Sequence, residues 1–556
     1  MNLNIFKNFK KTDEQMFMDT ESREAEIARL FREAASAKTQ VEEYWQKMRA
    51  YYSGTHETAR KTGAFLASVN VPWKPAQIAD GYMHVESQVV PKMPDFEFAP
   101  RSAEDGEAAK AREKIVRYIA ESNEMEAKNA MNERRLGVLG SAVWKLSAYI
   151  DSRGMPEIAI DNPSPQNIYP DPSAASVEDC EFIGYTYRMS KMRARRVFAA
   201  DFARMGTTLD GLIEEARKDK KKRETLDIDI FDERCPTVDV LEWWFRQGED
   251  GVYINADGNA TAYSRGDIAL SILIGGKEVR YVPKFWSNTV GGNFPFVIYG
   301  RVPNDGSIWG KSELEEIIPL IDAADRQLAF AQLNAAFFAN DVLVYEENAF
   351  APDSLPDNRP GAVWKLRPGM IDKVSRLGGL TADSEAHYEI VERYRKIIKE
   401  TLGNYDYMQG DFSTKVTTAT GLAILSDLAA ARIGAKNVCK KEGFRELYRL
   451  CDLFALEFFT KEKTELVLGS DANGKTSAEY FAEYGYIPEI DVRIHIGEGA
   501  ENSRSFTISA LSELASMEIT AENYPIVRSY ISALDLPNKA ELTEELDKKY
   551  RTDTGE

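Results

Sequence analysis

The sequence predicts an α+β protein that is mainly helical and extended rather than one compact globule. Residues 418–459 form a proline-free helical stretch, which at ~1.5 Å per residue would span about 60 Å. Residues 141–160 and 238–299 contain short runs of strand-forming side chains separated by turn residues, which favours antiparallel sheet. Two further predicted helices, residues 312–338 and 384–401, flank a short β-rich insert.

Composition limits the function classes. The chain has 556 residues, enough for three or four modules of roughly 150 residues, and 43% hydrophobic residues allow sizeable cores. The formal net charge is −19, whereas a protein that binds nucleic acid over its whole surface carries a basic excess. If DNA is a partner, it is either repelled or contacts a few local basic groups.

The sequence contains no recognisable metal-binding motif, membrane-spanning segment or secretory signal. The four cysteines and four histidines are scattered, without metal-ligand spacing: Cys180, Cys235, Cys439, Cys451, His56, His84, His387 and His495. No apolar run is long enough to span a membrane, and the lysines near the N-terminus precede no apolar signal segment. We therefore expect no bound metal, no cofactor, no membrane partner and a cytoplasmic site of synthesis.

The first third of the chain begins with helices. Residues 21–52 carry an apolar stripe that Gly54 ends, made of Ile27, Leu30, Phe31, Ala34, Val41, Tyr44, Trp45, Met48 and Tyr52. A buried helix is predicted over residues 76–90. Another is predicted over residues 116–139, ending near Gly137 and Gly140.

The following segment predicts a sheet-containing body. A hairpin joins residues 143–150 and 157–160, and a loop set by prolines follows at residues 162–172. Another short strand is predicted at residues 182–187, and strands at residues 238–245, 252–254, 269–274 and 294–299 are expected to form one antiparallel α+β body. Residues 191–202 predict a basic helix, and the charge run at residues 214–232 predicts a solvated insertion.

The second half alternates helices with short strands. Ser312 and Glu315 fit a capping box that opens the helix over residues 312–338, and Pro319 should kink or offset it. In the β-rich insert between the two helices, strands are predicted at residues 342–345 and 362–366. They flank a linker rich in Pro, Asp and Asn, and Pro368-Gly369 turns the chain. Strands at residues 464–468 and 490–496 are expected to be joined across Asp471 to Gly474, and the last fifty residues to be helical.

The long helix has a predicted core face near its C-terminal end. Its members recur at helical spacing: Phe444, Leu447, Tyr448, Leu450, Cys451, Phe454, Ala455 and Phe458.

One segment resembles a phosphate-binding loop. Gly306-Ser307-Ile308-Trp309-Gly310-Lys311-Ser312 follows a predicted strand and opens a predicted helix. A phosphate-binding loop needs four residues between its glycines, and here there are three, while Asp305 occupies the position of the required glycine. We therefore expect a helix start rather than a nucleotide site. No other pattern supplies a catalytic residue, and an enzyme is not expected.

The order of these parts resembles the portal proteins of tailed bacteriophages, over about residues 40–540. The resemblance rests on this layout and on four short stretches, namely residues 44–54, residues 162–172 before 178–180, residues 310–315, and residues 417–421 before a long helix that contains Arg432. It implies a portal-like fold with an antiparallel β-containing wing, a helical stem, a small β-rich clip and a helical crown.

The resemblance also implies boundaries for these parts. They are an N-terminal helical arm (1–50), an α+β wing (51–310), a first stem helix (311–340), a clip (341–382), a second stem helix (383–402), a tunnel loop (403–417), a long helix with returning wing strands (418–504), and a crown (505–556).

The function implied by the resemblance is structural. Portal proteins form a ring, expected to be a dodecamer, at one capsid vertex, where the ring nucleates head assembly and passes double-stranded DNA during packaging and ejection. The implied partners are further copies of the chain, the major capsid protein, the scaffolding protein, the large terminase subunit and a head-completion or adaptor protein. The protein would be found in the virion, and in host cytoplasm during assembly.

Two sets of site residues follow from the resemblance. The tunnel loop would present Asn404, Tyr405, Asp406, Tyr407, Gln409, Asp411 and Lys415 to DNA. Lys415 is its one basic residue, either a weak phosphate contact or a solvated lysine. The clip would present Lys365, Arg367, Lys373 and Arg376 to DNA or to a docking partner, or these are ordinary surface charges.

Two alternatives remain open from the sequence. One is another ring-forming or scaffolding virion protein, which would also be acidic and helical. The other is an enzyme with an unrecognised site, which would need convergent polar groups in a pocket.

Overall fold

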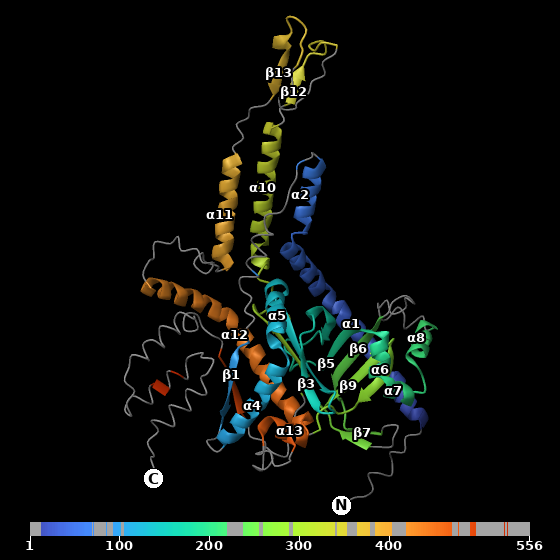
Figure 1. The fold of residues 1–556 in the computed structure, drawn as a ribbon. Coiled ribbons are helices and arrows are strands. Elements are labelled where there is room, and N and C mark those ends of the chain that lie inside the picture. Colours follow the sequence, from blue (N-terminus) through green and yellow to red (C-terminus); the bar gives the residue numbers. More distant parts are fainter. Residues whose placement is uncertain are drawn as a thin grey trace, which may run out of the picture.

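The structure is a computed structural model that combines helices with antiparallel sheets, as the α+β prediction requires. Figure 1 shows a body that holds most of the strands, the helices α2, α10 and α11 projecting from it, and the strands β12 and β13 at the far end. The structure describes residues 13–68, 71, 85, 93–101, 105–218, 237–254, 260–287, 293–339, 342–352, 364–377, 384–402, 419–469, 476–477, 490–495, 527–528 and 531.

The elements have the following bounds. The helices are α1 (Asp13–Ser53), α2 (Glu57–Ser68), α4 (Gly106–Ser122), α5 (Met125–Leu139), α6 (Lys191–Val197), α7 (Ala199–Arg204), α8 (Leu209–Lys218), α10 (Ile318–Ala339), α11 (Ser384–Leu402), α12 (Ala419–Phe458) and α13 (Lys461–Leu468). The strands are β1 (Asp95–Pro100), β2 (Ser141–Ile150), β3 (Pro156–Asp161), β4 (Ile168–Pro170), β5 (Phe182–Ser190), β6 (Thr237–Arg246), β7 (Gly251–Ile254), β8 (Ala260–Tyr263), β9 (Ile268–Ile274), β10 (Lys277–Val282), β11 (Phe296–Gly300), β12 (Val342–Tyr345), β13 (Val374–Leu377) and β14 (Ile490–His495). Short 3₁₀ turns are η3 (Pro165–Asn167), η4 (Glu315–Ile317) and η5 (Ile371–Lys373).

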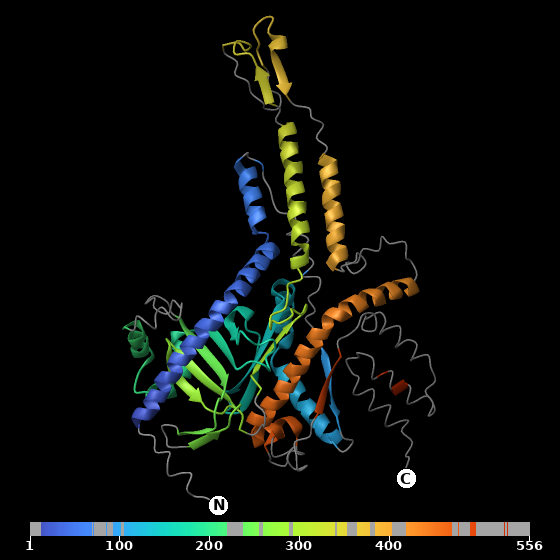
Figure 2. The ribbon, with the colours of Figure 1, turned by 180° about the vertical axis from the view of Figure 1, so that it is seen from behind.

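The largest sheet has five antiparallel strands in the order β10-β9-β6-β5-β4. Alternate residues of β6 point to opposite faces, so Leu241 and Trp243 pack under α1 while Val240 and Trp244 join the main core. All seven residues of β9 are buried, because both faces of the sheet are covered. Figure 2 shows α1 lying across this sheet.

A three-stranded sheet, β11-β2-β3, packs against α12. The predicted hairpin at residues 143–160 is therefore confirmed, as is the long helix, which runs without a break for 40 residues. Seven members of its predicted core face are buried and Phe458 is half-buried. Gly443 of α12 allows this close packing, since a Cβ there would lie 2.6 Å from the Tyr299 ring.

Several local predictions were wrong. The helix predicted over residues 116–139 is two helices, because Glu124 takes a left-handed backbone conformation (φ 48°) between α4 and α5. The predicted basic helix at residues 191–202 is likewise split into α6 and α7. By contrast, the strands predicted between residues 238 and 299 do exist in the body, where they are distributed over two antiparallel sheets and a separate β7–β8 ribbon.

The strand predicted at residues 464–468 is also wrong, since these residues lie in α13. Its buried positions, Lys463, Thr464, Val467 and Leu468, recur at helical spacing. The strand predicted at residues 490–496 exists as β14, but its partner is β1, with Phe98 opposite Val492. Two elements far apart in sequence thus form one small antiparallel ribbon.

Two predicted elements lie largely outside the described residues. They are the helix over residues 76–90, of which only Val85 is described, and the helical C-terminus, of which residues 527–528 and 531 are described.

Candidate functional site

The segment that projects from the body is a helix–strand–helix unit. Helices α10 and α11 lie side by side in both ribbon views, and α2 lies along the other side of α10 (Figures 1 and 2). The helix predicted over residues 384–401 is therefore confirmed. His387 of α11 links the pair, with Nδ1 2.8 Å from the Gln327 side-chain oxygen and Nε2 3.2 Å from the Asn334 amide nitrogen.

Helix α10 is unusually poor in charge for a helix that projects from a body. Its only charged residues are Asp322, Asp325 and Arg326. Its outward stripe consists of the exposed residues Pro319, Arg326, Phe330 and Asn334 at helical spacing, with Phe330 and Asn334 beside His387 of α11. The Phe330 side chain is 52% exposed. A helix that is apolar around most of its circumference is normally buried by neighbours.

Polar contacts fix the base of α10 to the end of α1 and the start of α2. The Tyr51 hydroxyl lies 3.2 Å from both carboxylate oxygens of Asp322. Burial, with Asp322 adding to it, raises the pKa of Tyr51 to about 12. His56, buried and stacked on the Tyr51 ring, lies with Nε2 3.3 Å from Asp325 Oδ2. These contacts hold the orientation of the projecting helices.

The loop that resembles a phosphate-binding loop is a joint between three backbone segments. A Cβ at Gly310 would lie 2.5 Å from the Gly140 carbonyl oxygen and 3.1 Å from the Gly300 Cα. The backbone N–H groups here donate to protein acceptors: Gly310 to Ser141 Oγ, Lys311 to Val302 O, Ser312 to Tyr44 Oη and Glu313 to Gly137 O. These donors are committed to the joint rather than directed at a ligand.

The predicted capping box at Ser312 is replaced by another arrangement. Glu315 accepts a hydrogen bond from the Tyr44 hydroxyl of α1 (2.9 Å). The Ser312 hydroxyl donates to the Gly137 carbonyl and accepts from the N–H of Leu314. The chain then forms the 3₁₀ turn η4, and α10 starts at Ile318 with Pro319 in its first turn, where a missing N–H is tolerated. Of the two effects predicted for Pro319, the structure shows the offset of the helix start rather than a kink.

A buried charge network lies beside this joint. Glu133 of α5 contacts Arg301 (2.7 Å) and Lys440 of α12 (2.8 Å), and Arg301 also contacts Glu313 (3.3 Å). Every one of these side chains is at most 7% exposed. The network connects α5, the end of β11, the foot of the projecting unit and α12. Sequence reasoning missed it, although Lys440 stands four residues before Phe444 on the apolar face of α12.

The predicted clip residues lie at the far end of the projecting unit. Strand β12 is confirmed but pairs with β13, so that Leu343 is opposite Arg376. The strand predicted at residues 362–366 is reduced to a single bridge between Phe350 and Leu366 within the described part. Lys365, Arg367 and Lys373 are exposed. Lys373 pairs with Glu346 across the surface (2.6 Å), and this hydrogen bond raises the pKa of Lys373.

The predicted tunnel-loop residues lie outside the described residues, between the end of α11 and the start of α12. They are Asn404, Tyr405, Asp406, Tyr407, Gln409, Asp411 and Lys415.

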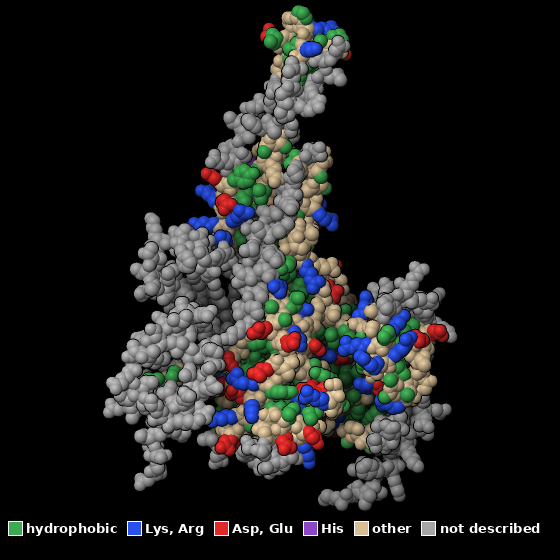
Figure 3. Space-filling model, viewed as in Figure 1, with side chains coloured by type: hydrophobic (Ala, Val, Ile, Leu, Met, Phe, Trp, Pro, Cys, Tyr) green, Lys and Arg blue, Asp and Glu red, His purple; other side chains and the backbone are tan. Residues whose placement is uncertain are grey.

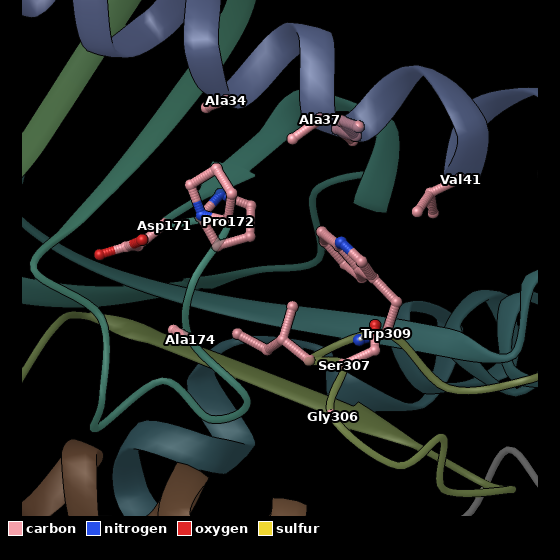
Figure 4. Close-up of a pocket in the computed structure, with 12 residues that line it drawn as sticks. Ala34, Ala37, Val41, Asp171, Pro172, Ala174, Gly306, Ser307 and Trp309 are labelled. Carbon is pink, nitrogen blue, oxygen red and sulfur yellow. Dashed lines mark hydrogen bonds between the residues drawn. The ribbon is translucent and has the colours of Figure 1, made fainter.

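A small cavity of about 160 Å³ lies between α1 and the loops at residues 170–174 and 306–309 (Figure 4). Lys38 on its wall is buried and donates to the Gln166 carbonyl (2.5 Å), with Glu42 3.4 Å away and the Tyr169 ring centroid at 4.1 Å. Burial lowers the pKa of Lys38 to about 8. The Lys38 ammonium group is thus buried between α1 and the body, with contacts that offset only part of the cost of burying its charge.

Replacing Lys38 with methionine should stabilise the protein at pH 7 by about 1–2 kcal/mol. Burying the charge costs about 1.4 kcal/mol per unit of pKa depression, which exceeds the loss of the Gln166 contact. The pKa of Lys38 in the folded state lies below the usual 10.5. The contribution of Lys38 to the free energy of unfolding of the wild type therefore rises between pH 8 and pH 10.5. The gap between Lys38→Met and wild type, measured by urea unfolding, should therefore narrow over that range. Lys47→Met, at an exposed position of α1, should show no such trend; a gap that widens with pH would contradict the assignment.

Two properties of the described residues bear on other functions. No group of three or more His, Cys, Asp or Glu side chains in the described part has the geometry to hold a metal ion. Among the helices that the structure describes, none combines the length and the apolar character that crossing a membrane requires.

Comparison with known proteins identifies the family. Residues 84–424, more than half of the chain, match the family model described as Phage P22-like portal protein. A search of curated proteins gives no match. The matched region includes the strands β1 to β11, the joint at Gly310, and the projecting helices α10 and α11 with β12 and β13. Portal proteins of this family are structural rather than enzymatic. The resemblance inferred from the sequence is confirmed, and the chain belongs to the P22-like portal protein family of tailed bacteriophages.

Proposed function

We propose that this chain assembles into a ring, a dodecamer as in the family it belongs to, that forms the DNA channel at one capsid vertex. The observation that carries the proposal is helix α10. It projects from the body with two described neighbours, α2 and α11, and still exposes an outward stripe with a single charge. A neighbouring copy would bury that stripe, and burying one phenylalanine side chain contributes about 1.5–3 kcal/mol.

The parts of a portal follow from this arrangement as proposals. The body formed by residues 51–310, with α12, α13 and β14, would be the wing, and residues 1–50 the arm that lies on it. Helices α10 and α11 would be the two stem helices, and β12 with β13 the core of the clip at residues 341–382. Residues 403–417 would be the tunnel loop, and residues 505–556 the crown.

The electrostatics suit a channel through which DNA slides. A chain of net charge −19 repeated around a ring makes a strongly negative body. Tight phosphate binding releases counterions and needs basic groups, so an acidic channel disfavours it. In the tunnel loop, Lys415 would make at most a transient phosphate contact. The ring would pass double-stranded DNA during packaging and ejection, without doing the chemistry itself.

Docking would take place at the clip. Lys365, Arg367, Lys373 and Arg376 would face the terminase during packaging and the head-completion or adaptor protein afterwards. The wing would contact the major capsid protein and the scaffolding protein while the head assembles. The protein would therefore be in host cytoplasm during assembly and at the portal vertex of the virion.

The proposal is tested by the mass of the purified chain in solution with negative-stain images of the same sample. We expect rings of about a dozen 62.6 kDa chains around a hole wide enough for a DNA duplex. A compact monomer or dimer at high concentration and across salt concentrations contradicts the proposal.

Phe330→Glu should prevent ring assembly while leaving the chain folded. The substitution places a charge in the stripe that a neighbouring copy would bury, and an unpaired buried charge costs several kcal/mol at every interface. Sedimentation velocity should show small species in place of rings, with an unchanged circular dichroism spectrum. Tyr149→Glu is the matched control, because Tyr149 is equally exposed (53%) but lies on β2 of the body. Intact rings in Phe330→Glu would exclude the α10 stripe from the interface.

A further inference from the structure

Helix α6 presents a basic and apolar surface at an edge of the body. This α6 patch consists of Lys191, Met192, Arg193, Arg196 and Val197. Met192 is 79% exposed and Val197 is 44% exposed, large fractions for apolar side chains. In Figure 3, Lys and Arg side chains gather with apolar ones over the region of α6 to α8.

The orientation of α6 is fixed from its inner side. Ala194 (0% exposed) and Phe198 (1% exposed) pack into the core, and the Arg280 guanidinium covers the Phe198 ring at 5.4 Å. Ser190 caps the helix by accepting a hydrogen bond from the N–H of Arg193 (3.2 Å). The exposed side chains of the α6 patch are therefore held on the outer face by a docked helix.

The basic side chains of the α6 patch differ from nearby arginines in their ion pairing. Arg195 pairs with Asp210 (2.9 Å), and Arg204 pairs with Asp201 (2.6 Å). Lys191, Arg193 and Arg196 have no carboxylate within ion-pair distance in the part of the chain that the structure describes. Three cations that lack a carboxylate partner among the described residues are thus concentrated on one short helix of a chain whose net charge is −19.

We propose that the α6 patch docks an acidic amphipathic helix of a partner protein. The cations alone would suit phosphates or carboxylates. Met192 and Val197 favour carboxylates on a protein, because duplex DNA is contacted mainly through its phosphates and sugars, which give two exposed apolar side chains little apolar surface to pack on. A helix with one acidic and one apolar face satisfies both sets of groups. Methionine, flexible and polarisable, adapts to such a face. The proposal does not depend on ring formation.

The test uses the full chain and a fluorescent synthetic helix of about 20 residues, roughly 30 Å long, with leucine along one face and glutamate elsewhere. A second peptide has the same composition with its leucines distributed around the helix. A short DNA duplex is the third probe. Fluorescence anisotropy should show binding of the amphipathic peptide, at least tenfold weaker binding of the redistributed peptide, and still weaker binding of the duplex.

Substitutions locate the site. Met192→Gln should weaken binding of the amphipathic peptide about tenfold, since burying a methionine is worth at least the ~1.4 kcal/mol of a tenfold change. Arg193→Gln combined with Arg196→Gln should weaken it and reduce its dependence on salt. Met131→Gln and Arg153→Gln, at exposed positions elsewhere on the body, should leave it unchanged.

Several outcomes overturn the proposal. Equal binding of the two peptides means that charge alone is recognised. Binding of the duplex without the peptide assigns the patch to nucleic acid. Unchanged peptide binding in the α6 variants, or no binding of any probe, removes the patch as a docking site. A change in the subunit number caused by Met192→Gln would assign the patch to contacts between copies of this chain.

Discussion

Replacing Gly310 with alanine should destabilise the chain by more than about 4 kcal/mol, enough to abolish folding in many domains. The added Cβ would lie 2.5 Å from the Gly140 carbonyl oxygen and 2.9 Å from the Val302 carbonyl oxygen. Both obstacles are backbone atoms, so no side chain can rotate away. Relief would require separating the foot of the projecting unit from the end of α5. Soluble yield and the urea midpoint measure the effect.

The matched control lies in the same loop. Gly306 has a left-handed backbone conformation (φ 69°), but a Cβ there would meet nothing within 4 Å. Gly306→Ala should therefore cost only about 1–2 kcal/mol of backbone strain. If Gly310→Ala were as stable as Gly306→Ala, the close backbone approach would not constrain this position.

These two glycines show why a motif can mislead. The letters from Gly306 to Ser312 resemble a phosphate-binding loop because a glycine, a lysine and a hydroxyl residue precede a helix. The spacing argued against a nucleotide site from the sequence. The reason for Gly310 itself, a crossing of three backbone segments, involves residues up to 170 positions away and leaves no local pattern.

The elements predicted well are those with long local periodicity. Helix α12, helix α11 and the β2–β3 hairpin each contain enough residues for a period to be recognised. The strand prediction for residues 464–468 failed because a run of five residues that contains threonine, valine and leucines fits a strand as well as a helix. In the structure these residues are helical, and Lys463 on their buried face contacts Glu157 and Tyr118. The β1–β14 pairing was not predictable, since its partners lie almost 400 residues apart.

The candidate site also combines features that the sequence reveals with features that it does not. The low charge of α10 is visible in the sequence and points to burial by neighbours. The network of Glu133, Arg301, Glu313 and Lys440 is not visible, because charged residues are usually solvated and nothing in the sequence pairs them. The one available signal was Lys440 in line with Phe444 and Leu447 on the apolar face of a helix.

Breaking that network should give the second large effect. Glu133→Gln leaves Lys440 buried without a carboxylate, and Lys440→Met leaves Glu133 and Glu313 to share Arg301. Each single change should cost about 3–5 kcal/mol, as removal of one partner of a buried ion pair does. Arg445→Gln, which breaks an exposed pair with Glu442 on the same helix, should change stability by less than about 0.5 kcal/mol.

The double variant separates charge balance from simple loss of contacts. Glu133→Gln with Lys440→Met removes one charge of each sign and leaves Arg301 paired with Glu313. Urea unfolding should show that the double variant loses at least about 2 kcal/mol less free energy of unfolding than the two single variants lose together. This difference is the coupling expected for groups in one network. Additive costs would show that Glu133 and Lys440 act independently. Coupling of the expected size would show that charge compensation between these two side chains holds α5 and α12 together.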